Sequence, residues 1–133
     1  MSKDVRGCSS VDTPIMRTVP ILAVKDLATA IEFYGRLGFV ARRYRDGDSY
    51  AFLSRDGFEL HLCRSDALAE CQNPGNGVYF YLVGGSAALL EAEFRAAGAP
   101  ILSPLAPREW KMNEFVLADP DGNLLRFGEE LRS

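Results

Sequence analysis

The sequence contains the same order of structural elements twice, and this repeat limits the possible fold more than any other feature. Each half reads as a strand, a helix and then three short strands. When the chain is aligned with itself so that Val24 meets Val83, Glu32 also meets Glu91. Such matches alone are weak, because helices share residues such as Glu for propensity reasons. Combined with the repeated order, they favour an internal duplication.

The first half, residues 18–64, opens with the apolar run TVPILAV, which suits a buried strand. Asp26 can cap the segment that follows, where apolar residues recur at helical spacing, so we expect a helix from about Leu27 to Leu37. Three short strands should come next, separated by the turn signals Asp46-Gly47 and Asp56-Gly57.

The second half, residues 77–130, repeats this order and ends in two strands around the turn Asp119-Pro120-Asp121-Gly122. Pro120 presets φ and Gly122 accepts a positive φ, as a tight turn requires. Its earlier segments are VYFYLV, SAALLEAEFRAAG and PILSP, which we interpret as a strand, a helix and a strand.

We therefore predict an α+β fold, in which two tandem βαβββ modules form a curved mixed sheet around a concave groove, with the helices on the outer face. Residues 18–133 should form a single domain. Residues 1–17 are expected to be an N-terminal arm, and residues 65–76, rich in Asn, Pro and Gly at their end, a linker.

Composition argues against several classes of function. The formal net charge is -3 and the basic residues are scattered, so nucleic acid is not an expected partner. No run approaches the roughly 20 apolar residues of a membrane span, and the first residues lack the apolar core of a secretory signal, so we expect a cytoplasmic protein. Cys8, Cys63 and Cys71 show no metal-binding spacing and are expected to be reduced thiols.

The run VPILAVKDLATAIEFYGRLGF, together with DPDGNLLRF, resembles the vicinal oxygen chelate superfamily. That superfamily includes glyoxalase I, extradiol dioxygenases, fosfomycin-resistance enzymes and bleomycin-resistance proteins. The likeness covers roughly residues 18–130. Both motifs are specific to the superfamily but do not separate its functions.

The resemblance implies where a metal would lie, because the enzymes place His or Gln on the first strand of each half and Glu on a late strand. These positions fall on Val19, Val78 and Arg126. Valine has no lone pair, and a protonated guanidinium repels a cation. The resemblance therefore implies no metal, no cofactor and no catalytic residue, and Arg126 would pair with a carboxylate or meet a ligand anion.

Glu59 matches a fourth ligand position of the enzymes, and His61 lies on the same face of its strand. Two donors make a poor metal site, because a divalent ion needs about four to six. We expect Glu59 to pair with an arginine and His61 to be hydrogen-bonded locally. The alternative is a metal-dependent lyase or dioxygenase that uses both residues and further donors.

Among superfamily members without metal, the likeness is closest to the bleomycin-resistance proteins. Glu109-Trp110 corresponds to their E-W pair before the turn, and Pro20 to the proline where their N-terminal arm crosses to a second subunit. The resemblance implies a homodimer with exchanged arms, which confers resistance by stoichiometric binding of a bleomycin-like glycopeptide antibiotic. A binder of another small amphipathic ligand is a further alternative.

Bleomycins carry flat rings, amides and a cationic tail, so a binding groove needs aromatic faces and carboxylates. If Val78 faces the groove, Phe80 also does, whereas Tyr79 and Tyr81 pack beneath the helices or at the dimer interface. Trp110 either contacts the ligand or plugs the core. The expected ligand-binding residues are Tyr44, Tyr50, Phe52, Glu59, His61, Phe80, Trp110, Met112, Asn113, Glu114 and Arg126; the three consecutive residues Met112, Asn113 and Glu114 would otherwise be an ordinary polar edge strand.

Overall fold

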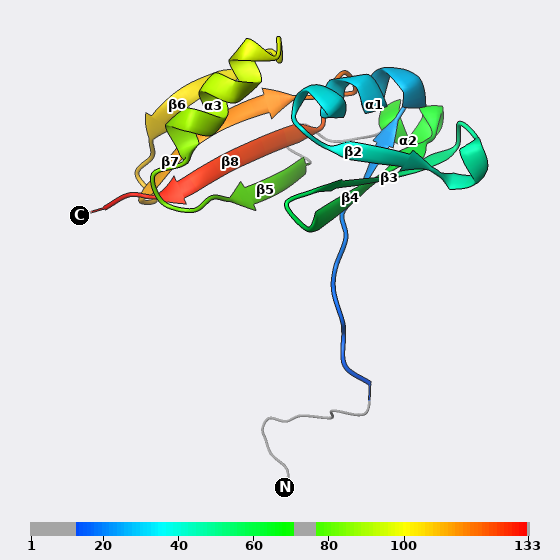
Figure 1. Cartoon of the computed structure of the whole chain (residues 1–133), viewed down its shortest axis with the longest axis horizontal. Helices are drawn as coiled ribbons and strands as arrows, with labels where there is room; N and C mark the ends of the chain where they lie inside the picture. The colour runs from blue at the N-terminus through cyan, green and yellow to red at the C-terminus, as the bar shows by residue number, and fades with distance from the viewer. Residues whose placement is uncertain (1–12, 71–76, 133) are drawn as a thin grey trace, which may run out of the picture.

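The computed structural model describes residues 13–70 and 77–132 and contains two modules (Figure 1). Module one consists of β1 (Ile21–Val24), α1 (Leu27–Arg36), β2 (Val40–Arg43), a 3-10 turn (Tyr44–Asp46), β3 (Tyr50–Arg55) and β4 (Phe58–Arg64). Module two consists of β5 (Gly77–Tyr81), α3 (Ala87–Ala96), β6 (Ser103–Pro107), β7 (Met112–Ala118) and β8 (Leu124–Glu130). A short helix, α2 (Asp66–Glu70), follows module one.

Each module builds its own four-stranded sheet with the same topology. The strand order is β1-β4-β3-β2 in the first sheet and β5-β8-β7-β6 in the second. In both, the first and last strands of the module pair in parallel and the other neighbours are antiparallel. The α+β fold of two tandem modules is confirmed, and the strands are divided between two sheets.

The helix of module one forms for the reasons seen in the sequence. The Asp26 side chain accepts a hydrogen bond from the Thr29 backbone N–H at 2.9 Å and so caps α1. Gly38, with φ +87°, takes the left-handed conformation that ends the helix. Leu27 and Tyr34 point from α1 into the core.

Some boundaries differ from expectation. The β1 strand begins at Ile21 rather than at residue 18, and Pro20, which has no N–H, contributes only its carbonyl, which accepts from the His61 N–H. The β6 strand starts at Ser103, three residues later than the expected run. The α2 helix occupies part of the expected linker. Residues 1–12 and 71–76, with Cys8 and Cys71, lie outside the described part of the chain; Cys63 is a free thiol.

One hydrophobic core runs through both modules. In module two, Phe94 of α3 packs edge-on against Phe115 and Phe127 of the sheet. At the boundary between the modules, the Phe39 and Phe80 ring centroids lie 6.2 Å apart, so the two apolar layers touch. The modules therefore stabilise each other by burial of apolar surface.

The Asp119 turn of module two docks on module one through a buried hydrogen-bond network. The Asp119 carboxylate accepts from the Tyr34 hydroxyl of α1 at 2.8 Å and from the Asn123 side-chain amide at 2.8 Å. The Lys25 N–H donates to Asp121, and the Asn123 amide also donates to the Ala23 carbonyl. The turn predicted from the sequence thus also serves as the contact between modules.

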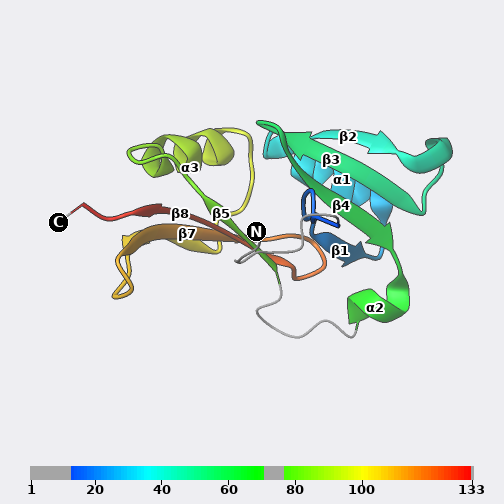
Figure 2. The same cartoon turned by 90° about the horizontal axis from the view of Figure 1, so that it is seen from below.

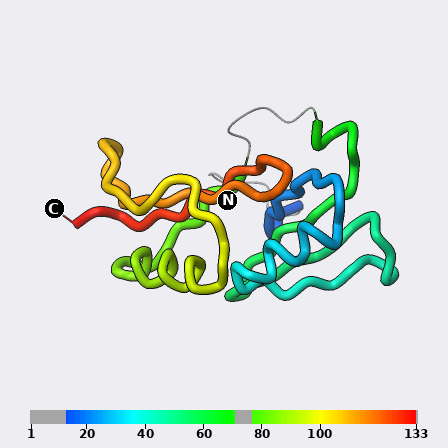
Figure 3. The backbone as a smooth tube through the Cα atoms, turned by 90° about the horizontal axis from the view of Figure 1, so that it is seen from above, coloured from blue at the N-terminus to red at the C-terminus, as the bar shows by residue number. Residues whose placement is uncertain are grey.

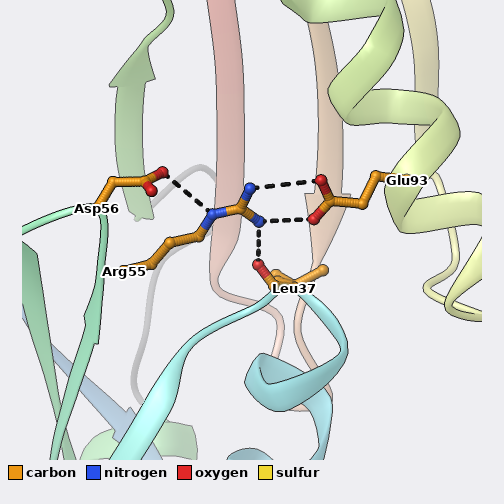
Figure 4. Close-up of polar contacts among 4 residues, drawn as sticks. All are labelled: Leu37, Arg55, Asp56 and Glu93. Carbon is orange, nitrogen blue, oxygen red and sulfur yellow. Dashed lines mark hydrogen bonds and ion pairs between the residues drawn. The ribbon is translucent and has the colours of Figure 1, made fainter.

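A second polar contact joins the modules at Arg55 (Figure 4). The Arg55 guanidinium donates to the Leu37 carbonyl at 2.6 Å and pairs with Glu93 of α3 at 2.9 Å and with Asp56 at 3.2 Å. A side chain at Gly38 would collide with this guanidinium. The contact therefore depends on a glycine that the end of the helix also requires.

The views from below and above show the two modules side by side (Figures 2 and 3). The helix α1 covers one face of the first sheet and α3 one face of the second. We call the uncovered sides the helix-free faces. The backbone of the described part of the N-terminal arm, residues 13–17, extends away from both modules (Figure 1), and of its described side chains only Arg17 makes a polar contact with module one, at Glu59. Within the described ranges, no helix is long and apolar enough to span a membrane.

We expect Tyr34→Phe to lower the free energy of unfolding by about 1–3 kcal/mol, because it removes one donor from a buried carboxylate. Urea titration followed by circular dichroism measures this.

Burial, followed by the Asp119 charge, raises the pKa of Tyr34 well above its ordinary 10.0, so only the unfolded state loses this proton just above pH 10. Wild-type stability should therefore fall as the pH rises above that value, and less steeply in the variant. An unchanged urea midpoint would contradict the assigned role of the network.

Candidate functional site

The strand register places a row of side chains across the helix-free face of module one. Ile21 lies beside His61, His61 beside Phe52, and Phe52 beside Arg42, one residue from each of the four strands. Their neighbours along the strands point to the other face; those on β3 and β4, Leu60 among them, are buried, and those on β2 are half-buried. The side chains of this row are therefore available to a ligand.

Aromatic rings dominate this face. Tyr50, Phe52 and His61 pack edge to face with centroids 4.8–5.4 Å apart, and the Tyr50 hydroxyl is hydrogen-bonded to His61 Nδ1 at 2.9 Å. Tyr44 lies against Phe52 at 6.4 Å. The structure thus brings together the aromatic candidates of the first half, and the expected local hydrogen bond of His61 is confirmed.

Three guanidinium groups lie on the same face. Arg17 of the arm pairs with Glu59 at 2.9 Å, which confirms that Glu59 is neutralised by an arginine, although not by Arg126. Arg42 lies 4.4 Å from the centroid of the Phe52 ring, and Arg45 lies 5.1 Å from that of Tyr44. Cation–π contact holds these two charges over the rings without neutralising them.

In module two, the expectation that Val78 and Phe80 face the groove is wrong. Phe80 stacks on Phe127 at 4.6 Å inside the core, and Val78 packs against the same core. The β5 residues on the helix-free face are Tyr79 and Tyr81. In the strand register, Tyr79 lies next to Arg126 of β8. A shift of one residue moves every side chain of a strand to the opposite face. Misplacing Val78 therefore also assigned Phe80, Tyr79 and Tyr81 to the wrong faces.

Glu114 organises the helix-free face of module two. Its carboxylate is 1% exposed, and Oε2 accepts from the Tyr79 hydroxyl at 2.5 Å and from Trp110 Nε1 at 2.7 Å. Burial, followed by the hydrogen bond to Glu114, raises the pKa of Tyr79, so its hydroxyl stays a donor. Gly128, opposite Glu114 on β8, leaves the space for this contact, because a side chain there would overlap the Tyr79 hydroxyl.

Trp110 does not plug the core. It lies between β6 and β7 and is 57% exposed, while its indole N–H is held by Glu114. Met112 shares the face of Glu114, whereas Asn113 points to the opposite side of the strand and Glu109 is exposed in the adjoining loop. The indole is therefore a fixed aromatic surface open to solvent.

The expected ligand residues fall into two groups, one on each helix-free face. One pocket at the module boundary is lined by residues such as Gly38, Arg55 and Glu93, and a second by residues such as Tyr81 and Arg132. Neither of these pockets joins the two aromatic groups. Sequence reasoning missed Tyr79, Tyr81, Arg42 and Arg45 as residues of these faces. The strand β5, with the sequence GVYFY, has no polar–apolar alternation that could have distinguished its two faces.

The donor set does not fit the metal that enzymes with these motifs would hold. Val19 and Val78 carry no donor atom, Arg126 carries a positive charge, and Glu59 is paired with Arg17. Across residues 13–70 and 77–132, no three His, Cys, Asp or Glu side chains gather as metal ligands would. We therefore assign no metal chemistry to these faces.

We expect Glu114→Ala to release Trp110, because the indole and the Tyr79 hydroxyl both lose their acceptor. Trp110 is the single tryptophan, so its fluorescence reports this site alone. The emission should shift to longer wavelength and acrylamide quenching should rise, with a loss of about 1–3 kcal/mol in the free energy of unfolding. Glu109→Ala, at the exposed neighbour, is the control and should change neither; equal spectra for both variants would contradict the assignment.

Comparison with known proteins identifies the architecture. The chain is 26% identical to a bleomycin resistance protein of Geobacillus stearothermophilus over 140 residues, covering 90% of this chain and 100% of the relative. Among solved structures, a glyoxalase/bleomycin resistance protein/dioxygenase from Nocardioides is 21% identical, with TM-score 0.69, covering 92% of this chain and 89% of that chain. A bleomycin-binding protein complexed with bleomycin is 24% identical, with TM-score 0.65, over 87% of this chain and 99% of that one.

The sequence profile of one family also matches nearly the whole chain. The match runs from residue 15 to residue 127 and so includes both modules. The chain belongs to the glyoxalase/bleomycin resistance protein/dioxygenase superfamily.

Proposed function

We propose that the protein is a cytoplasmic, dimeric binding protein that sequesters a bleomycin-like glycopeptide antibiotic and leaves it chemically unchanged. The observation that carries this proposal is the pair of exposed, fixed aromatic surfaces on the helix-free faces. On module two, Glu114 holds Tyr79 and Trp110 by hydrogen bonds. On module one, Tyr50, Phe52 and His61 pack against one another. Rings that are already fixed lose little side-chain entropy when a flat ligand stacks on them.

Two relationships support the choice of ligand. The 26% identical relative is a bleomycin resistance protein, and a protein of similar fold binds bleomycin. The polar groups at these faces suit sequestration, since a hydroxyl, an imidazole and an indole can orient amides and rings without attacking them. Nanomolar binding would correspond to about 12 kcal/mol, which two opposed aromatic faces can supply.

A second copy of the chain would bring two such faces together. Within one chain the aromatic groups lie on separate sheets, whereas a ligand groove needs opposed walls. The arm exposes Ile15 by 86% and Met16 by 91%, and it projects away from both modules (Figure 1). Apolar side chains displayed on an extended arm favour a contact with a partner. We propose that the arms are exchanged between subunits near Pro20.

Titration of the protein with metal-free bleomycin should show saturation near one drug per subunit. Calorimetry gives the stoichiometry, and the fluorescence of Trp110 reports occupancy of module two. Recovery of unchanged drug after denaturation would demonstrate sequestration. Absence of binding, or conversion of the drug, would overturn the proposal; a divalent ion held in stoichiometric amount would direct attention to the enzyme alternative with Glu59 and His61.

A matched pair of aromatic substitutions refines this titration. Trp110→Ala should weaken binding about tenfold or more, because stacking area is lost. The control is Phe58→Ala, which removes another exposed ring, 74% accessible, at the start of β4. Phe58 points to the side of its sheet opposite the helix-free face, so this variant should leave the affinity unchanged. Phe58→Ala should keep the free energy of unfolding within about 0.5 kcal/mol of the wild type, whereas Trp110→Ala should lower it by about 1–3 kcal/mol, because it removes one donor from the buried Glu114 carboxylate; affinities are therefore compared under conditions where both variants are fully folded. Equal affinities for the two variants would exclude Trp110 from the site.

The exchanged arms predict a dimer that depends on apolar arm residues. The double variant Ile15→Asp with Met16→Asp should sediment as a monomer at concentrations where the wild type is a dimer, because a charge cannot be buried unpaired in the partner contact. Leu89→Asp changes an equally exposed apolar residue on α3 and should sediment like the wild type. Identical sedimentation of wild type and double variant would contradict the arm contact.

A further inference from the structure

We propose that the helix-free face of module two is a subsite for the acidic group of a planar aromatic ligand. Arg126 would bind a carboxylate or sulfonate oxygen, and Tyr81 and Trp110 would contact the attached ring. This inference deepens the proposed function and rests on it, since it concerns the charge of the small molecule that the faces bind. A flat ligand that carries an acidic group should then bind this face more tightly than the same rings without that group.

Arg126 occupies a central position on its sheet, and its guanidinium has no recorded partner among the described residues. It lies on β8, between Tyr79 of β5 and Val116 of β7. Its guanidinium forms no ion pair or hydrogen bond with any other residue of the ranges 13–70 and 77–132. The side chain is partly buried, yet it leaves no sealed polar atom without a partner. Its donors are therefore open to a molecule that arrives on this face.

The carboxylate nearest in register to Arg126 is occupied elsewhere. Glu114 lies diagonally across from Arg126, is fully buried, and accepts the hydrogen bonds of Tyr79 and Trp110. Glu130 is on the same face but four residues further along β8, about 13 Å at the usual rise of a strand. The Arg126 guanidinium therefore has no carboxylate acceptor among the described residues, and it lies beside Tyr79, whose ring is held in place by Glu114.

The neighbouring rings define the shape of the ligand. The ring centroids of Tyr79 and Tyr81 lie 4.8 Å apart. Tyr81 is 78% exposed and Trp110 is 57% exposed. An exposed ring next to a guanidinium fork matches a planar molecule that carries an oxyanion, because the fork can donate two parallel hydrogen bonds to it. A neutral ring would gain the stacking contact but not the charge-assisted bonds.

Module one repeats this combination independently. Arg42 and Arg45 lie over the rings of Phe52 and Tyr44 and form no ion pair with another described residue, whereas Glu59 is neutralised by Arg17. The charges over these rings of module one are therefore positive and have no ion-pair partner among the described residues, and the same holds for Arg126 beside Tyr79 in module two. Such guanidinium groups attract an aromatic anion.

The test uses two fluorescent probes that share their rings and differ in one acidic group. Anilinonaphthalene sulfonate carries a sulfonate, and N-phenylnaphthylamine lacks it. The wild type should bind the sulfonate at least about tenfold more tightly. Arg126→Gln should weaken the sulfonate about ten- to a hundredfold, the usual effect of a lost charge-assisted bond, and leave the neutral probe unchanged. The affinity of Arg126→Lys for the sulfonate probe should lie between those of the wild type and Arg126→Gln.

The control is Arg36→Gln, which makes the same change of charge on the exposed side of α1 and should leave both affinities unchanged. Equal loss in Arg36→Gln and Arg126→Gln would reduce the effect to net charge and overturn the subsite, as would a wild type that binds both probes equally. If the wild type binds no bleomycin, the proposed function fails, whatever the two probes do. Binding of the neutral probe and bleomycin with no preference for the sulfonate would overturn the subsite alone.

Discussion

The carboxylate of Asp119 is the point on which the arrangement of the two modules depends. It is buried, and it accepts hydrogen bonds from Tyr34 of module one and from Asn123 of its own turn. A buried carboxylate without these donors would cost several kcal/mol. The last hairpin of module two can therefore be buried only where module one supplies the Tyr34 hydroxyl, and this requirement fixes how the modules meet. The Arg55–Glu93 pair supports the same boundary from another side.

Because α1 and α3 each cover one side of their sheet, the helix-free faces stay uncovered by helices. Glu114 has a comparable role there, since one buried carboxylate fixes both Tyr79 and Trp110. The cost of burying its charge is offset by two hydrogen bonds and by the space that Gly128 leaves. Rings that are fixed in this way lose little side-chain entropy when a molecule contacts them.

The proposed function and the proposed acidic subsite follow from different features of these faces. The aromatic surfaces and the family support the binding of a flat molecule. The charges of these faces bear on the chemical class of that flat molecule. Arg42, Arg45 and Arg126 have no carboxylate partner in the described part of the chain, and they favour a ligand that carries an acidic group. Carboxylates were expected to attract a cationic tail, but Glu59 and Glu114 are engaged inside the protein.

The sequence by itself determined the repeated order of elements, the cap at Asp26, the Asp119 turn and the aromatic composition of the strands, since all of these depend on local preferences and periodicity. It also placed His61 on the same face of its strand as Glu59, because alternation along an extended strand is local. Only the tertiary structure decided that Tyr79 rather than Val78 lies beside Arg126, that Glu59 meets Arg17, and that Glu114 is buried beneath two rings. Strand register and ion-pair choice depend on residues distant in the chain, so no local pattern encodes them.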